Sequence, residues 1–320
     1  MINLVHCLVA FGLALFGAYL LTPVVEQVAR RANVIRKPRL RDVHTRDMPL
    51  WGGIAIVVSV LFAFILTIPL RGQHQDKVIG IVLASLIVAG FGIADDKYDL
   101  SALVQLCALL LAGWVVTLFG VRIAFISHPF GPGTIDLDNL HLSVPITMLW
   151  VFFVTKATDI IDGVDGLAAG VSAISLATLA ALSLLTGNIV GAVMAATVSG
   201  SAIGFLRHNF NPARIFMGTV GAQFLGFMLA ALSVLCLTKI TTIVTLSVSV
   251  MVIGVPLMDA VFVTIRRIVT MQPISKADKG HVHHRLLRSG LSQRETVYVL
   301  YTVTLLLCLS AVGVYVVTHR

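Results

Sequence analysis

Residues 142–160 read LSVPITMLWVFFVTKATDI, and three aspartates follow at short spacing in DIIDGVDGL (159–167). A hydrocarbon core about 30 Å thick needs roughly 20 predominantly apolar residues per helix, so this run is long enough to cross a membrane. Similar runs recur along the chain at 3–25, 50–70, 77–95, 100–120, 164–186, 188–206, 219–238, 241–265 and 297–318. The sequence therefore predicts an all-α, polytopic membrane protein with about ten transmembrane helices.

Composition supports this fold class. Hydrophobic residues make up 58% of the 320 residues and charged residues only 12%, and the mean hydropathy of +0.96 excludes a soluble globule. The connections are short, so residues 1–320 are expected to form a single transmembrane domain. Run 3–25 exceeds a signal-peptide core and lacks a basic segment before it, so we expect it to be retained. Segment 121–141 alternates around a Pro/Gly turn, which predicts a short hairpin on the outer side.

The distribution of Lys and Arg predicts the orientation. Loops 26–49, 95–99, 207–218 and 266–296 carry 17 of the 23 basic residues, and cytoplasmic loops hold the positive excess. These loops are therefore expected to be cytoplasmic, with both termini outside. The net charge of +8 does not indicate nucleic-acid binding, because no recognised nucleic-acid module accompanies the basic residues. Membrane lipid head groups and phosphates are the expected partners.

Carboxylates gather at two of the predicted cytoplasmic helix ends, where they are costly unless paired, hydrated or bound to a cation. Asp95 and Asp96 end one run, although a solvated helix end with Lys97 as counter-ion also explains that pair. Asp159, Asp162 and Asp165 follow another run at i, i+3 steps. Neighbours at that spacing can share one ion, and without compensation they would repel one another, which favours a functional site.

Two basic segments lie on the same predicted face. The first lies around Arg207, Asn211 and Arg214, and it has two explanations: it binds phosphate, or it only reflects the excess of positive charge in cytoplasmic loops. The second holds three histidines and an arginine within 281–285. Neighbouring arginines suit phosphate oxygens better than a transition metal, although a metal site and a plain solvated loop remain open. Carboxylates and basic groups together suit Mg²⁺-assisted chemistry on a phosphorylated substrate, with one substrate cytosolic and the other held in the lipid.

Four motifs in order resemble the polyprenyl-phosphate N-acetylhexosamine-1-phosphate transferases of glycosyltransferase family 4. They are ADD (94–96), DGVDGL (162–167), NPARIFMG (211–218) and HVHHRL (281–286), and the likeness covers nearly the whole chain. Through PISKADKGHVHH (273–284) the chain looks most similar to the undecaprenyl-phosphate GlcNAc-1-phosphate transferases.

The resemblance implies a reaction in which the phosphate of undecaprenyl phosphate attacks the β-phosphorus of a UDP-sugar, expected to be UDP-GlcNAc. The products would be lipid-diphosphate-sugar and UMP, made for cell-envelope polysaccharide synthesis at the bacterial plasma membrane, with Mg²⁺ or Mn²⁺ as cofactor. The implied catalytic residues are Asp95 and Asp96, which orient or deprotonate the lipid phosphate, and Asp162 and Asp165, which shape the nucleotide and metal site. The expected substrate-binding residues are Lys156, Arg207, Asn211, Arg214, His281, His283, His284 and Arg285, and the expected metal ligands are Asp159 and Thr219.

Several polar positions depart from the family pattern. Lys156 and Asp159 stand where the family usually has Asn, and Thr219 stands where it has the Asp of Met-Gly-Asp. Gln105 and Leu109 replace an expected Lys and Gln. Because a threonine hydroxyl is a poor ligand for a hard dication, Asp159 could restore the charge, and Lys156 could pair with it or replace the metal. A non-catalytic homologue that binds polyprenyl phosphate or UDP-sugar, and an unrelated transporter, remain alternatives. A homodimer through lipid-facing helices is compatible with the sequence.

Overall fold

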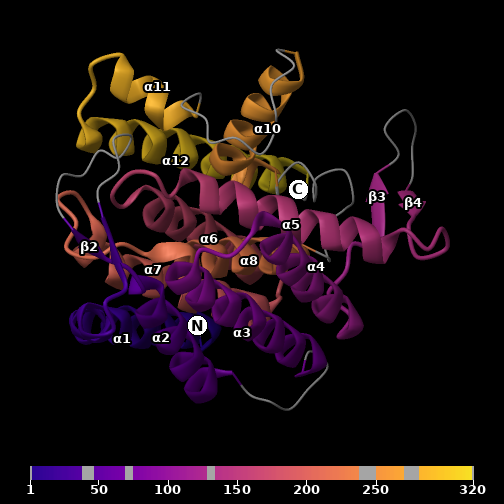
Figure 1. Cartoon of the computed structure of the whole chain (residues 1–320). Helices are drawn as coiled ribbons and strands as arrows, with labels where there is room; N and C mark the ends of the chain where they lie inside the picture. The colour runs from indigo at the N-terminus through magenta and orange to yellow at the C-terminus, as the bar shows by residue number, and fades with distance from the viewer. Residues whose placement is uncertain are drawn as a thin grey trace.

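The protein is a helical bundle in a computed structural model that describes residues 2–37, 47–68, 75–127, 134–237, 250–269 and 281–318 (Figure 1). The helices are α1 (Ile2–Arg31), α2 (Gly52–Thr67), α3 (Gln75–Tyr98), α4 (Ala102–Leu118), α5 (Ser143–Ile161), α6 (Leu167–Leu185), α7 (Ile189–Asn209), α8 (Gly218–Leu237), α10 (Gly254–Val269), α11 (Val282–Arg288) and α12 (Gln293–Thr318). The predicted all-α class is confirmed.

Seven of these helices are long and apolar enough to cross a membrane, namely α1, α3, α5, α6, α7, α8 and α12. Helices α2 and α4 are apolar but shorter, with 16 and 17 residues. The predicted run 241–265 lies partly outside the described residues, and α10 begins within it at Gly254. The prediction of a multi-pass membrane protein is confirmed.

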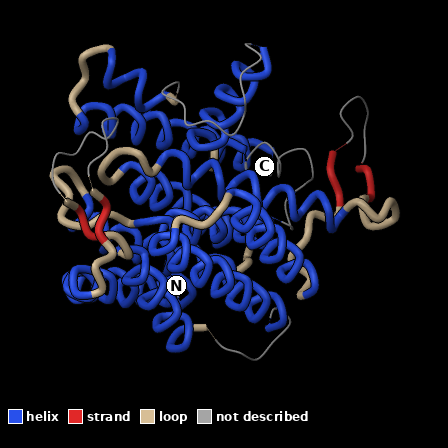
Figure 2. The backbone as a smooth tube through the Cα atoms, viewed as in Figure 1, coloured by secondary structure: helices blue, strands red, loops and turns tan. Residues whose placement is uncertain are grey.

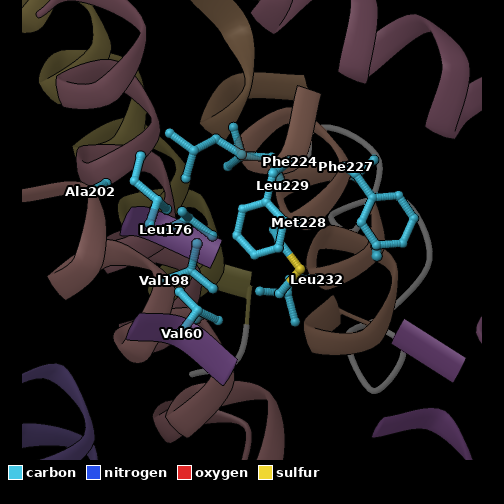
Figure 3. Close-up of a cluster of buried hydrophobic side chains, with 14 of the residues drawn as sticks. Val60, Leu176, Val198, Ala202, Phe224, Phe227, Met228, Leu229 and Leu232 are labelled. Atoms are coloured by element: carbon cyan, nitrogen blue, oxygen red, sulfur yellow. The ribbon is translucent and has the colours of Figure 1, made fainter. Parts of the chain in front are cut away.

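Helix α8 lies at the centre of the bundle. Its membrane window is 89% buried, more than that of any other candidate span in the described residues. It packs against α3, α5, α6, α2 and α7, which leave little of its surface for lipid. Figure 3 shows the buried cluster formed by Phe224, Phe227, Met228, Leu229 and Leu232 of α8 with Val60, Leu176, Val198 and Ala202 of neighbouring helices. This packing fixes the position of the α8 N-terminus, which lies beside the carboxylates described below.

Glycines allow α8 to approach its neighbours closely, as small residues do between membrane helices. A Cβ atom added to Gly53 of α2 would lie 2.2 Å from the Cα of Gly221 on α8. A Cβ atom on Gly92 of α3 would lie 2.5 Å from the Cα of Val220. In both places the nearest atoms belong to the backbone, so neither contact can be relieved by turning a side chain.

We therefore expect Gly53→Ala to lower the stability of the detergent-solubilised protein by about 1–3 kcal/mol, the usual range for overpacking. The measurement is the thermal unfolding temperature. Gly12→Ala is the matched control, because no atom lies within 4 Å of a Cβ atom built at Gly12 and alanine has the higher helix propensity. Equal unfolding temperatures for the two variants would contradict this account of the α2–α8 contact.

Two short antiparallel strand pairs lie at opposite ends of the bundle (Figure 2). Strands β3 (Phe125–Ser127) and β4 (Thr134–Asp136) confirm the predicted hairpin within 121–141, whose turn at 128–133 lies outside the described residues. Strands β1 (Ile35–Arg36) and β2 (Met48–Pro49) were not predicted and lie within the loop predicted at 26–49. The carbonyl of Pro49 accepts the N–H of Phe216 at 2.9 Å, which ties this strand pair to the turn that begins α8.

Candidate active site

Asp96 lies at the C-terminal end of α3 and caps the N-terminus of α8. Its carboxylate accepts the backbone N–H of Thr219 at 2.7 Å and that of Val220 at 3.4 Å. The first N–H groups of a helix lack partners within the helix and carry a partial positive charge, so a carboxylate is favoured there. Gly218 has a φ of +72°, and a Cβ atom on it would lie 2.4 Å from Asp96 Oδ2. The glycine of the Met-Gly sequence is thus required both for the backbone turn and for the approach of the carboxylate.

Asp95 begins a line of polar contacts that crosses four helices. Its Oδ1 accepts Gln105 Nε2 at 2.8 Å, and Gln105 Oε1 accepts Lys156 Nζ at 2.6 Å. Lys156 Nζ also donates to Asp159 Oδ2 at 2.7 Å, and the same oxygen accepts Gln223 Nε2 at 3.4 Å. These five residues, called the polar chain below, connect α3, α4, α5 and α8.

Four of the five departures from the family pattern lie near one another in this structure. Gln105, Lys156 and Asp159 are consecutive members of the polar chain, and Thr219 lies one helical turn before Gln223 on α8. The ion pair at 2.7 Å confirms that Lys156 pairs with Asp159, one of the two alternatives that the sequence left open. Gln105, Lys156 and Asp159 therefore form one connected arrangement across α4 and α5. Leu109, the fifth departure, is buried in the hydrophobic core.

The loop after α5 is held by its neighbours. Asp165 is 3% exposed, and its Oδ2 accepts the N–H of Ala213 at 3.1 Å and Asn211 Nδ2 at 3.2 Å. The carbonyl of Gly166 accepts the Tyr301 hydroxyl at 2.6 Å. Asp165 thus binds the turn that contains Asn211, which brings the two predicted segments together. The contacts described for Asn211 hold this loop in place.

Asp162 ends α5 and lies among other carboxylates. Burial raises the pKa of the Asp162 carboxyl well above its ordinary value, and the negative charges of Asp159 and Asp165 raise it further. Arg36 of β1 opposes them. The β1–β2 pair therefore supplies a guanidinium to the acidic cluster, which the sequence analysis did not foresee because it counted Arg36 only as a loop charge.

The histidine helix α11 is anchored by a carboxylate that the sequence analysis missed. Asp259 of α10 is 3% exposed, pairs with His281 Nδ1 at 2.9 Å and accepts the N–H of Val282 at 2.7 Å. A Cβ atom on Gly163 would lie 2.8 Å from His283 Nε2, so this ring rests on the aspartate loop. A lone Asp inside an apolar run was the available signal, because such a group needs a partner.

Burial lowers the pKa of His283 from 6.5 to about 4; His284 acts in the same direction and Asp259 opposes it. The unfolded segment therefore binds more protons than the folded one between these two values. The contribution of neutral His283 to the free energy of unfolding is therefore complete above about pH 6.5 and is lost as the pH falls toward 4. This contribution is roughly 3 kcal/mol.

We expect the unfolding temperature of the protein to fall between pH 7 and 4.5, and this fall to be smaller in His283→Gln. His141→Asn is the control, because His141 is exposed and asparagine tolerates its φ of 54°. An unchanged pH dependence in His283→Gln would contradict the buried, neutral state of this ring.

The remaining predicted residues differ in how closely they join the cluster. The rings of His283 and His284 lie 4.4 Å apart, and Arg285 is exposed with its guanidinium 5.1 Å from the Phe262 ring centre. Arg207 is exposed in the last turn of α7, and Arg214 is exposed in the turn that follows this helix. Among the described residues, neither arginine is one of the groups that hold the carboxylates. Residues 273–280 of the predicted motif lie outside the described residues.

The predicted metal ligands do not form a ligand set as they stand. The Asp159 carboxylate is paired with the Lys156 ammonium, and Thr219 hydrogen-bonds the Asp96 carboxylate through both its backbone and its side chain. Within the described ranges, no group of three His, Cys, Asp or Glu side chains could hold a metal ion. The requirement for Mg²⁺ or Mn²⁺ stays a prediction.

Comparison with known proteins gives consistent relatives. Residues 78–237 match the model of glycosyl transferase family 4. A "probable undecaprenyl-phosphate N-acetylglucosaminyl 1-phosphate transferase" of Bacillus subtilis (strain 168) is 37% identical over 97% of this chain and 85% of its own length. A decaprenyl-phosphate N-acetylglucosaminephosphotransferase of Mycobacterium leprae (strain TN) is 32% identical over 88% of this chain and 77% of its own length. An undecaprenyl-phosphate alpha-N-acetylglucosaminyl 1-phosphate transferase of Yersinia pestis is 27% identical over 91% of this chain and 79% of its own length.

The family match covers half of the chain, and the more similar relatives span nearly all of it. The four motifs that suggested the family surround the site just described, at the ends of α3, α5 and α7 and at the start of α11. The chain therefore belongs to glycosyl transferase family 4 and, within it, to the phosphoglycosyl transferases that its motifs predicted.

Proposed function

We propose that this protein transfers GlcNAc-1-phosphate from UDP-GlcNAc to undecaprenyl phosphate at the cytoplasmic face of the bacterial plasma membrane. An oxygen of the lipid phosphate forms a bond to the β-phosphorus of the UDP-sugar. The bond between that phosphorus and the oxygen that bridges it to the α-phosphorus breaks, and UMP leaves with this oxygen. The lipid-diphosphate-sugar would then serve cell-envelope polysaccharide synthesis.

One observation carries the proposal: carboxylates from the ends of α3 and α5 lie within electrostatic range of one another, and the histidine helix contacts the loop after α5. The end of the bundle with these carboxylates also carries the Arg-containing strand β1 and the turn that contains Arg214. A site at the membrane surface lets a nucleotide-sugar enter from water while the isoprenoid chain of the acceptor stays in lipid. The excess of basic residues on this side supports a cytoplasmic position.

The residues would act mainly by positioning and by electrostatic stabilisation. A phosphate monoester is already largely ionised at pH 7, so little proton removal is required from Asp95. Its Oδ1 accepts both the Leu100 N–H at 3.0 Å and the Gln105 amide at 2.8 Å, which holds this oxygen in place. Positively charged groups near the site, such as Arg36 and Lys156, would offset the charge of the phosphates during transfer.

The test is UMP release by purified protein supplied with UDP-GlcNAc, undecaprenyl phosphate and MgCl₂, with separate reactions in which EDTA replaces Mg²⁺ or one substrate is left out. We expect UMP only when both substrates are present. Binding of either substrate without UMP release would identify a non-catalytic homologue instead. Inverted and right-side-out vesicles test the face: UDP-GlcNAc added outside should be consumed only by inverted vesicles.

A further inference from the structure

Lys156 is a charged side chain near the end of the membrane helix α5, and such a position is expensive unless the charge is paired. Its ammonium donates to Gln105 Oε1 and Asp159 Oδ2, at 2.6 and 2.7 Å. An ammonium has three N–H donors, so these contacts leave one for another acceptor. The side chain is 26% exposed, and the ammonium is therefore held in place but still accessible from the site.

The position of Lys156 suits a phosphate group. On one side Gln105 links it to Asp95, and on the other Asp159 lies next to Asp162 in electrostatic range. The ammonium thus stands between the carboxylate pair of α3 and the aspartate loop. The surrounding carboxylates would repel a phosphate group unless a positive charge binds it. The ammonium of Lys156 is such a charge, and as a side chain of α5 it is always present in the site.

The same ion pair affects the binding of metal at Asp159. Both described donors to its carboxylate, the Lys156 ammonium and the Gln223 amide, bind Oδ2. A divalent cation would have to displace the ammonium or share the carboxylate with a like charge 2.7 Å from Oδ2, which costs electrostatic energy in a partly buried site.

We propose that Lys156 is the fixed cation of this site: its ammonium binds a phosphate oxygen of the substrate and competes with divalent cations for Asp159. The identity of the phosphate rests on the proposed function, because the same chemistry is offered by the diphosphate of UDP-GlcNAc and by the phosphate of the lipid acceptor. Two binding measurements distinguish these sources.

The first experiment measures the affinity of the full-length, detergent-purified protein for UDP-GlcNAc and for undecaprenyl phosphate, each alone. We expect Lys156→Gln to weaken binding of one or both by roughly 10- to 100-fold, the usual effect of losing a charge-assisted hydrogen bond. Lys156→Arg should retain binding. The control is Lys97→Gln, because Lys97 is exposed at the end of α3 and lies over the ring of Tyr98. Weaker binding of the nucleotide-sugar assigns the donor diphosphate, and weaker binding of the lipid assigns the acceptor. Unchanged affinity for both overturns the proposal.

The second experiment measures Mn²⁺ binding by electron paramagnetic resonance, without substrates. We expect Lys156→Gln to bind Mn²⁺ about tenfold more tightly than the original protein, because a carboxylate freed from its partner becomes a ligand. The double variant with Asp159→Asn should lose this gain. Equal Mn²⁺ affinities with and without Lys156 would overturn the competition. This measurement needs neither substrate nor turnover, so it tests the competition at Asp159 even if the proposed transfer reaction is wrong.

A variant with the opposite change guards against misfolding of Lys156→Gln. Asp159→Asn keeps the ammonium and removes its ion-pair partner, so the affinity for the phosphate ligand should be retained or increased. Loss of phosphate binding in folded Asp159→Asn would assign the site to the carboxylate instead and overturn the proposal. Thermal unfolding of each variant verifies that the compared proteins are folded.

Discussion

Asp95→Asn is expected to reduce the turnover number for UMP release by at least about a hundredfold, the scale of effect expected when a group that positions the reacting phosphate is lost. The folded structure should be retained. Asparagine keeps a carbonyl oxygen that can accept the Leu100 N–H and the Gln105 amide, the two donors that bind Oδ1 of Asp95. The substitution thus removes the charge and leaves the local hydrogen bonds, and the unfolding temperature should change little.

The pH profile of this variant separates two roles for Asp95. The second pKa of a phosphate monoester is about 6, so the lipid phosphate loses its remaining proton as the pH rises through that value. If Asp95 removes the proton, the defect of Asp95→Asn shrinks above about pH 7, whereas a positioning role leaves the defect constant. Asp99→Asn is the matched control, because Asp99 is exposed at the same helix end and asparagine tolerates its φ of 51°. Full turnover in Asp95→Asn would remove Asp95 from the site.

The parts of the fold that depend on local properties could be predicted from the sequence. An apolar run of membrane length is a helix wherever it packs, because no other structure satisfies its backbone in lipid. Carboxylates at the ends of α3 and α5 were recognisable for the same reason, since unpaired charge at a membrane surface is costly. Both inferences required only neighbouring residues.

The polar chain could not be derived in this way. Its members come from α3, α4, α5 and α8, and the helix periodicity of one sequence does not say which faces meet. The sequence alone does not say which partners Gln105 and Gln223 bind; in the structure, Lys156 and Asp159 lie between these two side chains. Strands β1 and β2 have two residues each, too few for an alternating pattern, so their loop was recognised only by its charge.

The capping role of Asp96 shows how such a site combines structure with chemistry. A carboxylate that accepts two N–H groups at the start of the central helix α8 is a structural cap, and it also belongs to the candidate site. Asp165 also combines the two roles, because its Oδ2 accepts the Asn211 amide and the Ala213 N–H and so holds this turn. Substitutions of these two aspartates are therefore expected to change stability and turnover together, which makes Asp95 the sharper test of the chemistry.

Asp259→Ala is expected to abolish most of the activity by releasing the histidine helix. The Asp259 carboxylate is 3% exposed and is bound by the His281 ring and by the N–H that starts α11. Removing one partner of a buried pair costs about 3–5 kcal/mol, because the other partner stays desolvated without compensation. Displacement of α11 would also move His283 away from Gly163, and we expect turnover to fall by about two to four orders of magnitude, the factor to which an energy of that size corresponds.

Asp138→Ala provides the matched control for Asp259→Ala. Asp138 pairs with Arg122 at 3.0 Å, but these side chains are 35% and 44% exposed, and exposed ion pairs contribute only about 0–1 kcal/mol. Asp259→Asn should recover part of the activity, because its amide oxygen can still accept the Val282 N–H while the charge beside His281 is lost. Limited proteolysis reports the release of α11 independently of turnover. If Asp259→Ala is as active and as resistant to protease as Asp138→Ala, the histidine helix is held by contacts other than Asp259, and its position relative to the aspartate loop does not depend on this carboxylate.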